Sequence, residues 1–320
     1  MLRRNLLILG TGLLAAPRVH AQAFPSAPMT LICAWPPGGG SDIAMRLVAE
    51  AASKKFGVPV VVDNRPGAAG AIGHRAIATA RPDGYTFGMF STAGVAAPYL
   101  NANANTIDEL EPLAFFGSDP SALQASTASG IASLQDFVTR ARANPGKIKN
   151  GNDQPGGASF LAVASYEKLM NFRIQKVPYA GYAPTVTALL AGEVDSATVA
   201  IPDTIEYHRQ GKLKILGVSS AERHFMAPEI PTFKEQGFDV EVGSWRCIAG
   251  PKGMPEDRLR TLRSGLLDAM RDPDFLAKAR QAGFTTQPGD AATTLARWRA
   301  DDQLLYTILD EAGLVKARKR

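Results

Sequence analysis

Short apolar runs alternate with glycine-rich turns and helix-forming segments along most of the chain, and this alternation constrains the fold most strongly. The clearest unit begins with an apolar run at Met29 to Trp35, which predicts a buried strand. The turn Pro36 to Gly40 follows. Ser41 and Asp42 then predict the cap of a helix, and Ile43 falls on its apolar face. Such units are typical of parallel sheets with both faces covered by helices.

The same unit recurs further along the chain. Val58 to Val62 predicts a second strand, and the helix after it carries Ile72 on its apolar side. Tyr85 to Phe90 predicts a third strand, and a fresh series of units begins near Leu123 and continues to a strand at Leu213 to Val218. We therefore expect an α/β protein with two parallel-rich sheets flanked by helices, one sheet in each of two lobes.

The C-terminal part of the chain predicts one strand from Trp245 onward and then only helices, which cannot build a third core. The simplest packing returns these helices to the first lobe. The chain then crosses between the lobes twice, near residues 116–123 and 240–245, and two crossings make a hinge. The expected division is a signal peptide at 1–21, lobe I at 22–119 and 245–320, and lobe II at 120–244.

The first residues resemble a secretion signal. Arg3 and Arg4 precede an apolar run from Leu6 to Ala16, and small-residue cleavage sites follow at residues 19–21 or 21–23. The run is far shorter than the roughly 20 apolar residues that a membrane-spanning helix needs. We expect a periplasmic protein, secreted after cleavage near Gln22. The arginine pair is compatible with both the general and the twin-arginine export routes.

Composition limits the partners. The 320 residues are 45% hydrophobic, enough for a sizeable core. The formal charge of +5 falls to +2 without the three arginines of the signal. It falls to about −2 without Lys316, Arg318, Lys319 and Arg320 at the basic end of the chain, so no nucleic-acid surface is expected. Cys33 and Cys247 both lie in apolar strands. A disulfide is permitted in this compartment, but small core side chains are the simpler expectation.

The run from Pro36 to Asp42 predicts an anion site. Its three glycines, Gly38, Gly39 and Gly40, let a ligand approach the backbone at the start of a helix. The N–H groups of the first helical turn have no intrahelical partners, and the helix dipole favours negative charge there. An ordinary turn with an aspartate cap explains Asp42 but not three consecutive glycines. The sequence therefore predicts that this loop binds a carboxylate or phosphate without any cation.

Two further loops follow predicted strands in the same way. Ser91 to Gly94 follows the third strand, and Gly151 to Ser159 follows a strand of the second lobe. Ligands of doubly wound sheets bind at the carboxyl ends of the strands, so these loops are expected to converge on one cleft.

Catalytic motifs are absent from the sequence. We find no G-x-S-x-G elbow, no phosphate-binding G-x-x-x-x-G-K-[ST], no complete G-x-G-x-x-G and no metal-ligand spacing, so we expect neither a cofactor nor a metal. His74, His208 and His224 are expected on solvated faces. An exported enzyme that uses an aspartate as its base is the alternative hypothesis, with Asp42, Asp153 and Asp203 as the candidates.

Several motifs together resemble one known family, the periplasmic substrate-binding proteins of tripartite tricarboxylate transporters, also called the Bug family. The resemblance covers essentially the whole chain after the signal. The motifs that carry it are Trp35 to Asp42, Val60 to Ala68, Pro82 to Thr86, Ala143 to Lys147, Val177 to Tyr179, Leu189 to Asp195, Gly211 to Leu213, Pro231-Thr232 and Ser244-Trp245.

The resemblance implies a two-lobed, periplasmic-binding-protein-like (flytrap) fold with a ligand cleft between the lobes. It also implies a small organic carboxylate as ligand, membrane components of a tripartite transporter as partners, and no catalysis. The protein is expected to be a monomer. The residues expected to bind the ligand are Trp35, Pro37, Gly38, Gly39, Gly40, Ser41, Asp42, Ser91, Thr92, Ala93, Asn152, Gly157, Ala158, Ser159, Phe160, Tyr179 and Val199.

Three positions depart from the family pattern. Val199 stands where many relatives have an acidic residue that suits an amino group, Phe160 replaces a polar residue, and Tyr182 replaces a small one. Because a valine cannot pair with an ammonium, amino-acid ligands become less favoured. One hypothesis is a carboxylate with an apolar or aromatic body that rests on Phe160, Val199 and Trp35. The alternative, that these side chains only pack the lobes, carries equal weight.

The same pocket would also serve a ligand sensor that presents its closed form to a signalling receptor. Such a sensor differs from a transport protein only in its membrane partner, and the sequence does not separate the two.

Overall fold

The computed structural model of the chain describes residues 24–311 and 313–318. The expected signal peptide, residues 1–21, lies outside this range. In the described part of the chain, no helix combines the length and apolar character that a membrane span requires.

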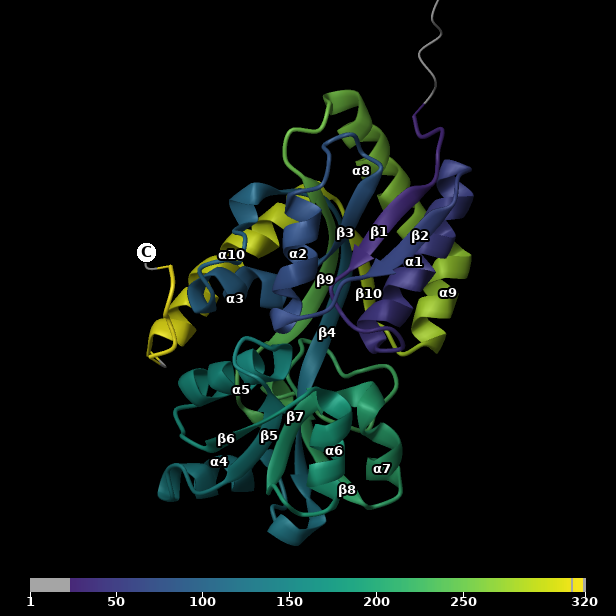
Figure 1. Ribbon diagram of the computed structural model, residues 1–320. Coiled ribbons are helices and arrows are strands. Elements are labelled where there is room, and N and C mark those ends of the chain that lie inside the picture. The colour runs from purple at the N-terminus through teal and green to yellow at the C-terminus, as the bar shows by residue number, and fades with distance from the viewer. Residues whose placement is uncertain (1–23, 312, 319–320) are drawn as a thin grey trace, which may run out of the picture.

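The first sheet occupies one half of the molecule (Figure 1). Its strands lie in the order β2-β1-β3-β9-β4, with β10 also paired to β4. β1, β2 and β3 run parallel, whereas β9, β4 and β10 join in antiparallel pairs. The bounds are β1 (Met29–Cys33), β2 (Val60–Asn64), β3 (Thr86–Ser91), β4 (Leu110–Ser126), β9 (Gly243–Pro251) and β10 (Thr286–Gly289).

The second sheet forms the core of the other half (Figure 1). β6, β5 and β7 are neighbours and run parallel, and both β7 and β8 pair with β4 in antiparallel fashion. The bounds are β5 (Lys149–Asp153), β6 (Gln175–Tyr179), β7 (Ser196–Ala200) and β8 (Leu213–Val218). Both sheets are therefore parallel within their strand–helix units and antiparallel where the crossing strands join them.

β4 belongs to both sheets. Its residues 110–120 pair with β9, and its residues 121–126 pair with β7 and β8. Figure 1 shows this long strand running from one half of the molecule into the other. The expected crossings, residues 116–123 and 240–245, fall on or beside β4 and β9. Where one lobe ends and the next begins stays a prediction.

Helices cover both faces of each sheet. On the first sheet, α1, α8 and α9 share one buried cluster with Leu31 and Phe116, and α2, α3 and α10 share the opposite cluster with Phe90 and Trp245. On the second, α4 and α5 lie on one face, and α6 and α7 on the other. The bounds are α1 (Gly40–Phe56), α2 (Ala71–Ala78), α3 (Thr92–Leu100), α4 (Leu134–Ala143), α5 (Ala158–Leu169), α6 (Tyr182–Leu190), α7 (Ile205–Arg209), α8 (Glu256–Arg271), α9 (Pro273–Gln281) and α10 (Ala291–Glu311).

The start of α1 differs from the sequence prediction. The helix begins at Gly40 with Gly39 as its N-cap residue, and no side chain caps it, so the expected cap by Ser41 and Asp42 was wrong. With the helix set in this register, Asp42 lies on the buried side, whereas Ile43 is 42% exposed.

The histidines also differ from the prediction. His74 and His224 are buried rather than solvated, and in α2 the buried side carries His74 while Ile72 is exposed. Burial lowers the pKa of His74 to about 4, so its ring is neutral at pH 7. The ring packs edge-on against Phe90, with 4.9 Å between centroids. These two histidines therefore act as core aromatic side chains.

Cys33 and Cys247 are both buried and unpaired. Cys33 packs in the cluster beneath α1, and Cys247 packs in the cluster on the opposite face of the sheet. Burial raises the pKa of both thiols, which keeps them protonated and unreactive. The expectation of two small core side chains is confirmed.

Trp298 attaches α10 to the first sheet. Its side chain is fully buried, its ring lies 4.9 Å from that of Phe90, and its Nε1 donates to Cys247 Sγ at 3.3 Å. We expect Trp298→Ala to lower the free energy of unfolding by about 3–5 kcal/mol, because it leaves a large cavity. Urea unfolding followed by circular dichroism measures this. Leu304→Ala, at an exposed position of the same helix, should change the midpoint little; equal losses in the two variants would contradict the packing described.

Candidate ligand-binding site

The connections of the first sheet change direction at one point. From β1 the chain passes through α1 to β2 on one side, and from β2 it passes through α2 to β3 on the other side. Open α/β sheets bind ligands outside the carboxyl ends of the strands at such a point. We call this place the first switch point; it comprises Gly38–Ser41 after β1 and Ser91–Ala93 after β3.

The second sheet repeats this topology. β5 leads through α5 to β6, and β6 leads through α6 to β7 on the other side of β5. The second switch point therefore comprises the residues at the ends of β5 and β7, which are Asn152, Asp153 and the segment Ile201–Asp203.

Loops from both halves meet between the lobes. The backbone of Gly156, before α5, lies against Leu100 at the end of α3, and that of Gly283, before β10, lies against Pro202. Pro202 of the second switch point, and Gly156 just after it in the β5–α5 loop, therefore lie against residues of the first lobe. Convergence of the three loops on one cleft stays a prediction.

The glycine loop leaves its backbone accessible. Pro37, Gly38, Gly39 and Gly40 are exposed, and Gly38 adopts a φ of +81° that favours glycine. In the described part of the chain, no side chain caps the start of α1. Its first N–H groups therefore remain available to a ligand. The loop has the geometry that the sequence predicts for an anion site.

Asp42 stabilises the conformation of this loop through hydrogen bonds. Its Oδ2 accepts from Gly38 N–H and from Arg46 Nε, both at 2.9 Å, and its Oδ1 accepts from Asn64 Nδ2 at 2.8 Å. Burial opposes ionisation, but the bonds from Arg46, Gly38 and Asn64 outweigh it and lower the pKa of Asp42. The side chain holds the glycine loop and is poorly suited to act as a base.

The N-terminus of α3 is buried without a cap. Every residue from Thr92 to Tyr99 is buried, and Ser91, the N-cap residue, makes no capping bond. Ser91 Oγ is itself buried and has no hydrogen-bond partner in the described part of the chain. Thr92 Oγ1 is used within the protein, because it accepts from Trp245 N–H at 3.1 Å. A buried helix end with unmet donors calls for an acceptor from outside the protein.

A cation lies beside these donors, contrary to the prediction of a site without one. Arg246, on β9, pairs directly with Ser91 in the sheet, so both side chains lie on the same face. Its Nε donates to Ser41 Oγ at 3.3 Å, its guanidinium lies next to Gly40, and it forms an ion pair with Asp119. Burial lowers the pKa of Arg246 to about 10, which is still well above neutral pH, so the guanidinium stays charged.

Arg246 was not predicted from the sequence as a site residue. Its strand was predicted, and strict alternation along Trp245, Arg246 and Cys247 would have placed a single charged side chain on one face of a buried strand. That isolated charge was the available signal.

The second-lobe loop is organised by its own side chains. Asp153 Oδ2 accepts from Ser159 N–H at 3.1 Å, and Ser159 Oγ accepts from Asp153 N–H at 2.7 Å. α5 begins at Ala158 with Gly157 as N-cap, so the protein's own carboxylate occupies its first turn. Asn152 Oδ1 differs: it is fully buried and has no partner among the described residues. Asn152, rather than Ser159, is the unsatisfied group of this loop.

Two residues near this loop, Asp203 and Tyr182, were not among the residues expected to bind the ligand of a binding protein, although Asp203 was a candidate base of the enzyme alternative. Burial raises the pKa of Asp203 to about 6, although the side chain still reaches solvent. No cation of the described chain is among the groups that lower this pKa. Tyr182 is half-buried, and burial followed by the charges of Asp153 and Asp203 raises its pKa well above the usual range. These three side chains therefore share one acidic, partly desolvated environment.

The remaining expected site residues lie in packed surroundings. Phe160 is 5% exposed and belongs to the same buried cluster as Trp245, so its ring packs where α5 meets the first lobe. Val199 is buried in β7, Tyr179 packs at the end of β6, and Trp35 packs partly beneath α1. The structure thus groups Gly40, Ser41 and Ser91 around Arg246 but sets Phe160 and Tyr179 in separate clusters. Their ligand contacts stay predictions.

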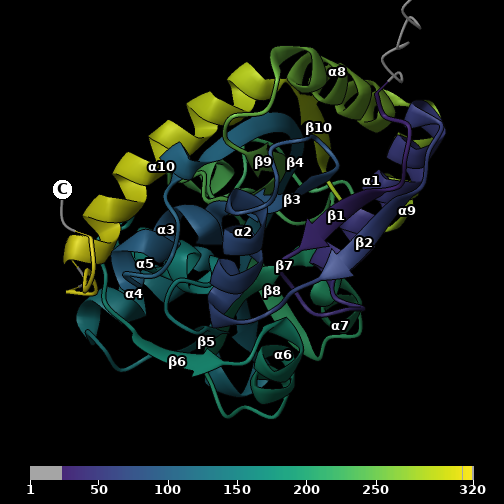
Figure 2. The same cartoon turned by 45° about the horizontal axis from the view of Figure 1, so that its top comes forward.

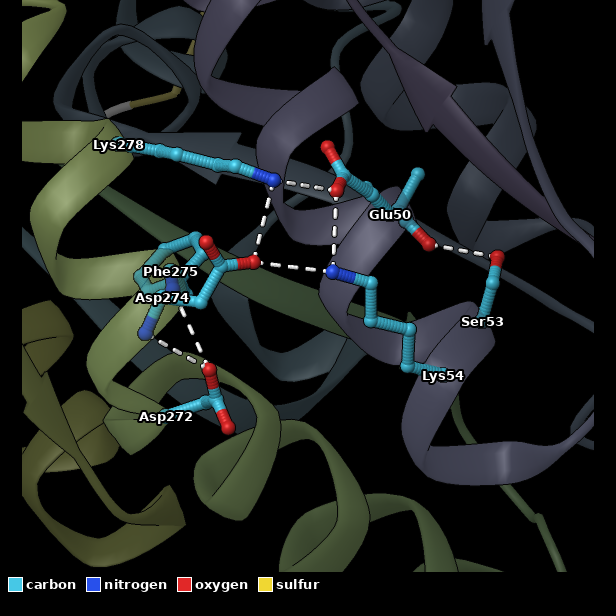
Figure 3. Close-up of polar contacts among 8 residues, drawn as sticks. Glu50, Ser53, Lys54, Asp272, Asp274, Phe275 and Lys278 are labelled. Atoms are coloured by element: carbon cyan, nitrogen blue, oxygen red, sulfur yellow. Dashed lines mark hydrogen bonds and ion pairs between the residues drawn. The ribbon is translucent and has the colours of Figure 1, made fainter.

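A different groove, of about 270 Å³, lies between α1, α8 and α9. Figure 3 shows its charged side chains in a closed network: Lys54 and Lys278 each contact both Glu50 and Asp274, at 2.6–3.1 Å between nitrogen and oxygen. These charges are exposed and already neutralise one another. No group of three or more metal-ligating side chains occurs in residues 24–311 or 313–318. The switch points therefore remain the better candidate.

The family model of the tripartite tricarboxylate transporter family receptor, TctC, matches residues 44–307. The chain belongs to this family. It is 31% identical over 284 residues to Protein BugT of Bordetella pertussis, covering 87% of each chain. It is also 32% identical over 274 residues to a protein from the tcbD-tcbE intergenic region of Pseudomonas sp. strain P51, covering 84% of this chain and 81% of the relative. The resemblance drawn from the motifs is confirmed.

Solved structures agree with this family assignment. The periplasmic binding protein BugD superposes with a TM-score of 0.77 at 27% identity, covering 92% of this chain and all of BugD. A Rhodopseudomonas palustris protein solved with adipate superposes with a TM-score of 0.78 at 24% identity, covering 91% of this chain and 98% of that one. A second protein from that organism was solved with malate. This TctC-family chain therefore has the fold of a periplasmic solute-binding protein.

The role of Asp42 in the glycine loop can be tested by stability. We expect Asp42→Asn to lower the free energy of unfolding by about 1–2 kcal/mol at pH 7, because bonds to Gly38 and Arg46 lose their charge assistance. Since the folded-state pKa is depressed, this contribution is present above the ordinary value of 3.8 and is lost as pH falls through the lower folded value. Urea unfolding at pH 7 and near pH 3 measures it.

Asp257→Asn is the matched control, since Asp257 also lies in the first turn of a helix, α8, but is exposed. Its substitution should change stability by less than about 0.5 kcal/mol at either pH. A loss for Asp42→Asn that does not shrink toward pH 3 would contradict the proposed role of its charge.

Proposed function

We propose that this protein captures a small organic carboxylate between its two lobes in the periplasm and delivers it to the membrane components of a tripartite tricarboxylate transporter. The ligand carboxylate accepts hydrogen bonds from the uncapped N-termini of α1 and α3, from the hydroxyls of Ser41 and Ser91, and from Arg246. The second-lobe loop closes over it. No cofactor, metal or covalent step is involved.

One observation carries this proposal: Ser91, at the buried start of α3, pairs in the sheet with Arg246, whose side chain is 14% exposed. Ser91 Oγ and the first-turn N–H groups have no acceptor among the described residues, and the Arg246 guanidinium lies on the same face. Donors and positive charge without a protein acceptor define a binding site for an anion. A carboxylate matches both the number of donors and the planar guanidinium.

The energetics are modest. Micromolar affinity requires about 8 kcal/mol of net binding free energy. A few charge-assisted hydrogen bonds in a water-poor site, together with some apolar burial, supply this after the cost of ordering the ligand. The relatives solved with adipate and malate support a carboxylate in particular.

The enzyme alternative gains less support. Asp42 and Asp153 are both engaged in hydrogen bonds that hold their loops, which leaves Asp203 as the candidate base with a raised pKa. A base alone does not make an active site, and no nucleophile or proton-transfer partner accompanies it in the described chain. A sensor role uses the same pocket and differs only in the membrane partner.

Carboxylate capture is tested by calorimetric titration, with the acid identified by native mass spectrometry of the purified protein. We expect Ser91→Ala to weaken binding about tenfold, because one hydrogen bond to a charged group is lost. Ser264→Ala, at an exposed position of α8, should bind as the unchanged protein does. Recovery of a chemically altered acid would favour the enzyme, and unchanged affinity in Ser91→Ala would remove α3 from the site.

Delivery is tested separately, with membrane vesicles that contain a tripartite tricarboxylate transporter. Uptake of the identified radiolabelled acid should require added protein and should rise with its concentration. If vesicles take up the acid equally well without the protein, delivery is refuted while capture stands.

A further inference from the structure

We infer that this site selects a ligand with one carboxylate, held at the first switch point, and a hydrogen-bond donor, either a hydroxyl or an ammonium, at the second switch point, and that it discriminates against dicarboxylates. This inference rests on the proposed function and names the ligand class for the same site.

The two switch points have opposite electrical character. The first presents two helix N-termini, Ser91 Oγ and the Arg246 guanidinium. The second presents Asp153 and Asp203 beside Tyr182. Since the topology of the two sheets is the same, the difference comes entirely from the side chains and from the segments at the carboxyl ends of the strands.

The first switch point has positive charge for about one carboxylate. Arg246 already forms an ion pair with Asp119, so its charge is shared with a protein carboxylate. The two helix ends contribute roughly half a positive charge each. The single negative charge of one ligand carboxylate balances the positive charge of the two helix ends.

The second switch point offers acceptors and negative charge. Asp203 reaches solvent, and Asn152 Oδ1 is a fully buried acceptor without a donor among the described residues. Burial raises the pKa of Asp203 to about 6, so it is mainly ionised at neutral pH.

Two cations on elements next to the second switch point, Lys176 and Arg280, are engaged with other groups. Lys176 forms an ion pair with Glu167, and the guanidinium of Arg280, from the first lobe, stacks on Phe225 at 4.2 Å. Neither group is among the causes of the raised pKa values of Asp153 and Asp203. A second ligand carboxylate here would face like charge, whereas an O–H or N–H group would meet acceptors.

Asp203 also changes what Val199 implies for the ligand. The apolar side chain of Val199 disfavours an amino group, but Asp203 lies only four residues later, just beyond the end of β7. The acidic character at the end of this strand is therefore retained by a different residue.

The test uses two series of acids that differ only at the end far from the carboxylate. The four-carbon series is butyrate, 4-hydroxybutyrate, 4-aminobutyrate and succinate, and the six-carbon series is hexanoate, 6-hydroxyhexanoate, 6-aminohexanoate and adipate. In calorimetric titration at pH 7.5, we expect the hydroxy or amino acid of at least one series to bind about tenfold or more tightly than the matching diacid. The hydroxy and amino arms identify which donor is used.

Asp203→Asn should reduce this discrimination at least about fivefold, because the diacid no longer faces the charge. Glu206→Gln removes the same charge from an exposed neighbouring position and should leave it unchanged. A diacid that binds the unchanged protein as tightly as its hydroxy and amino counterparts overturns the inference but leaves carboxylate capture intact. If no acid of either series binds, the inference fails, whereas carboxylate capture is judged separately with the acid identified by native mass spectrometry.

Discussion

One strand, β4, is shared by both sheets, and the arrangement of the whole molecule depends on this sharing. Its first part pairs with β9 and its last residues pair with β7 and β8, so the sheets are joined through continuous backbone hydrogen bonds. In Figure 2, with the top of the molecule turned forward, β4 and β9 still lie together within the first half. Because the two sheets share this strand, its pairing sets the position of one lobe relative to the other, and the proposed ligand site lies between them.

Within this space, the chemistry is divided between the lobes. The first lobe supplies donors and a cation, and the second supplies acceptors and carboxylates. Each lobe satisfies most of its own polar groups: Asp42 holds the glycine loop, and Asp153 holds the start of α5. Besides the two ring nitrogens of His74, the buried side-chain atoms without a partner in the described chain are Ser91 Oγ and Asn152 Oδ1, one in each lobe. A ligand that bridges them would complete the hydrogen bonding of both lobes.

Periodicity and turn residues were sufficient to predict most strands, the helices that cover them and the glycine loop, because burial on a sheet enforces these patterns. The helix registers were less predictable: Ile43 and Ile72 are exposed because the helices start at positions that no sequence signal marked. Arg246 was missed, and Asp203 was predicted only as a candidate base, because their surroundings arise from contacts between distant segments. His74 shows the same limit, since only the packed structure reveals that an imidazole replaces an apolar side chain in the core.

The contact between α5 and the first lobe has a mechanical consequence. Phe160 and Leu161 of α5 are buried in one cluster with Trp245 and with Trp298 of α10, and Lys168 of α5 pairs with Glu311 at the end of α10. Prising the halves apart at this edge would bring two large apolar side chains into water. At the opposite edge, the loop around Gly283 touches Pro202 and Met226, and the Arg280 guanidinium stacks on Phe225. Any relative movement of the halves would therefore cost apolar burial where α5 is anchored, whereas at the other edge it would separate loop contacts and one cation–aromatic stack.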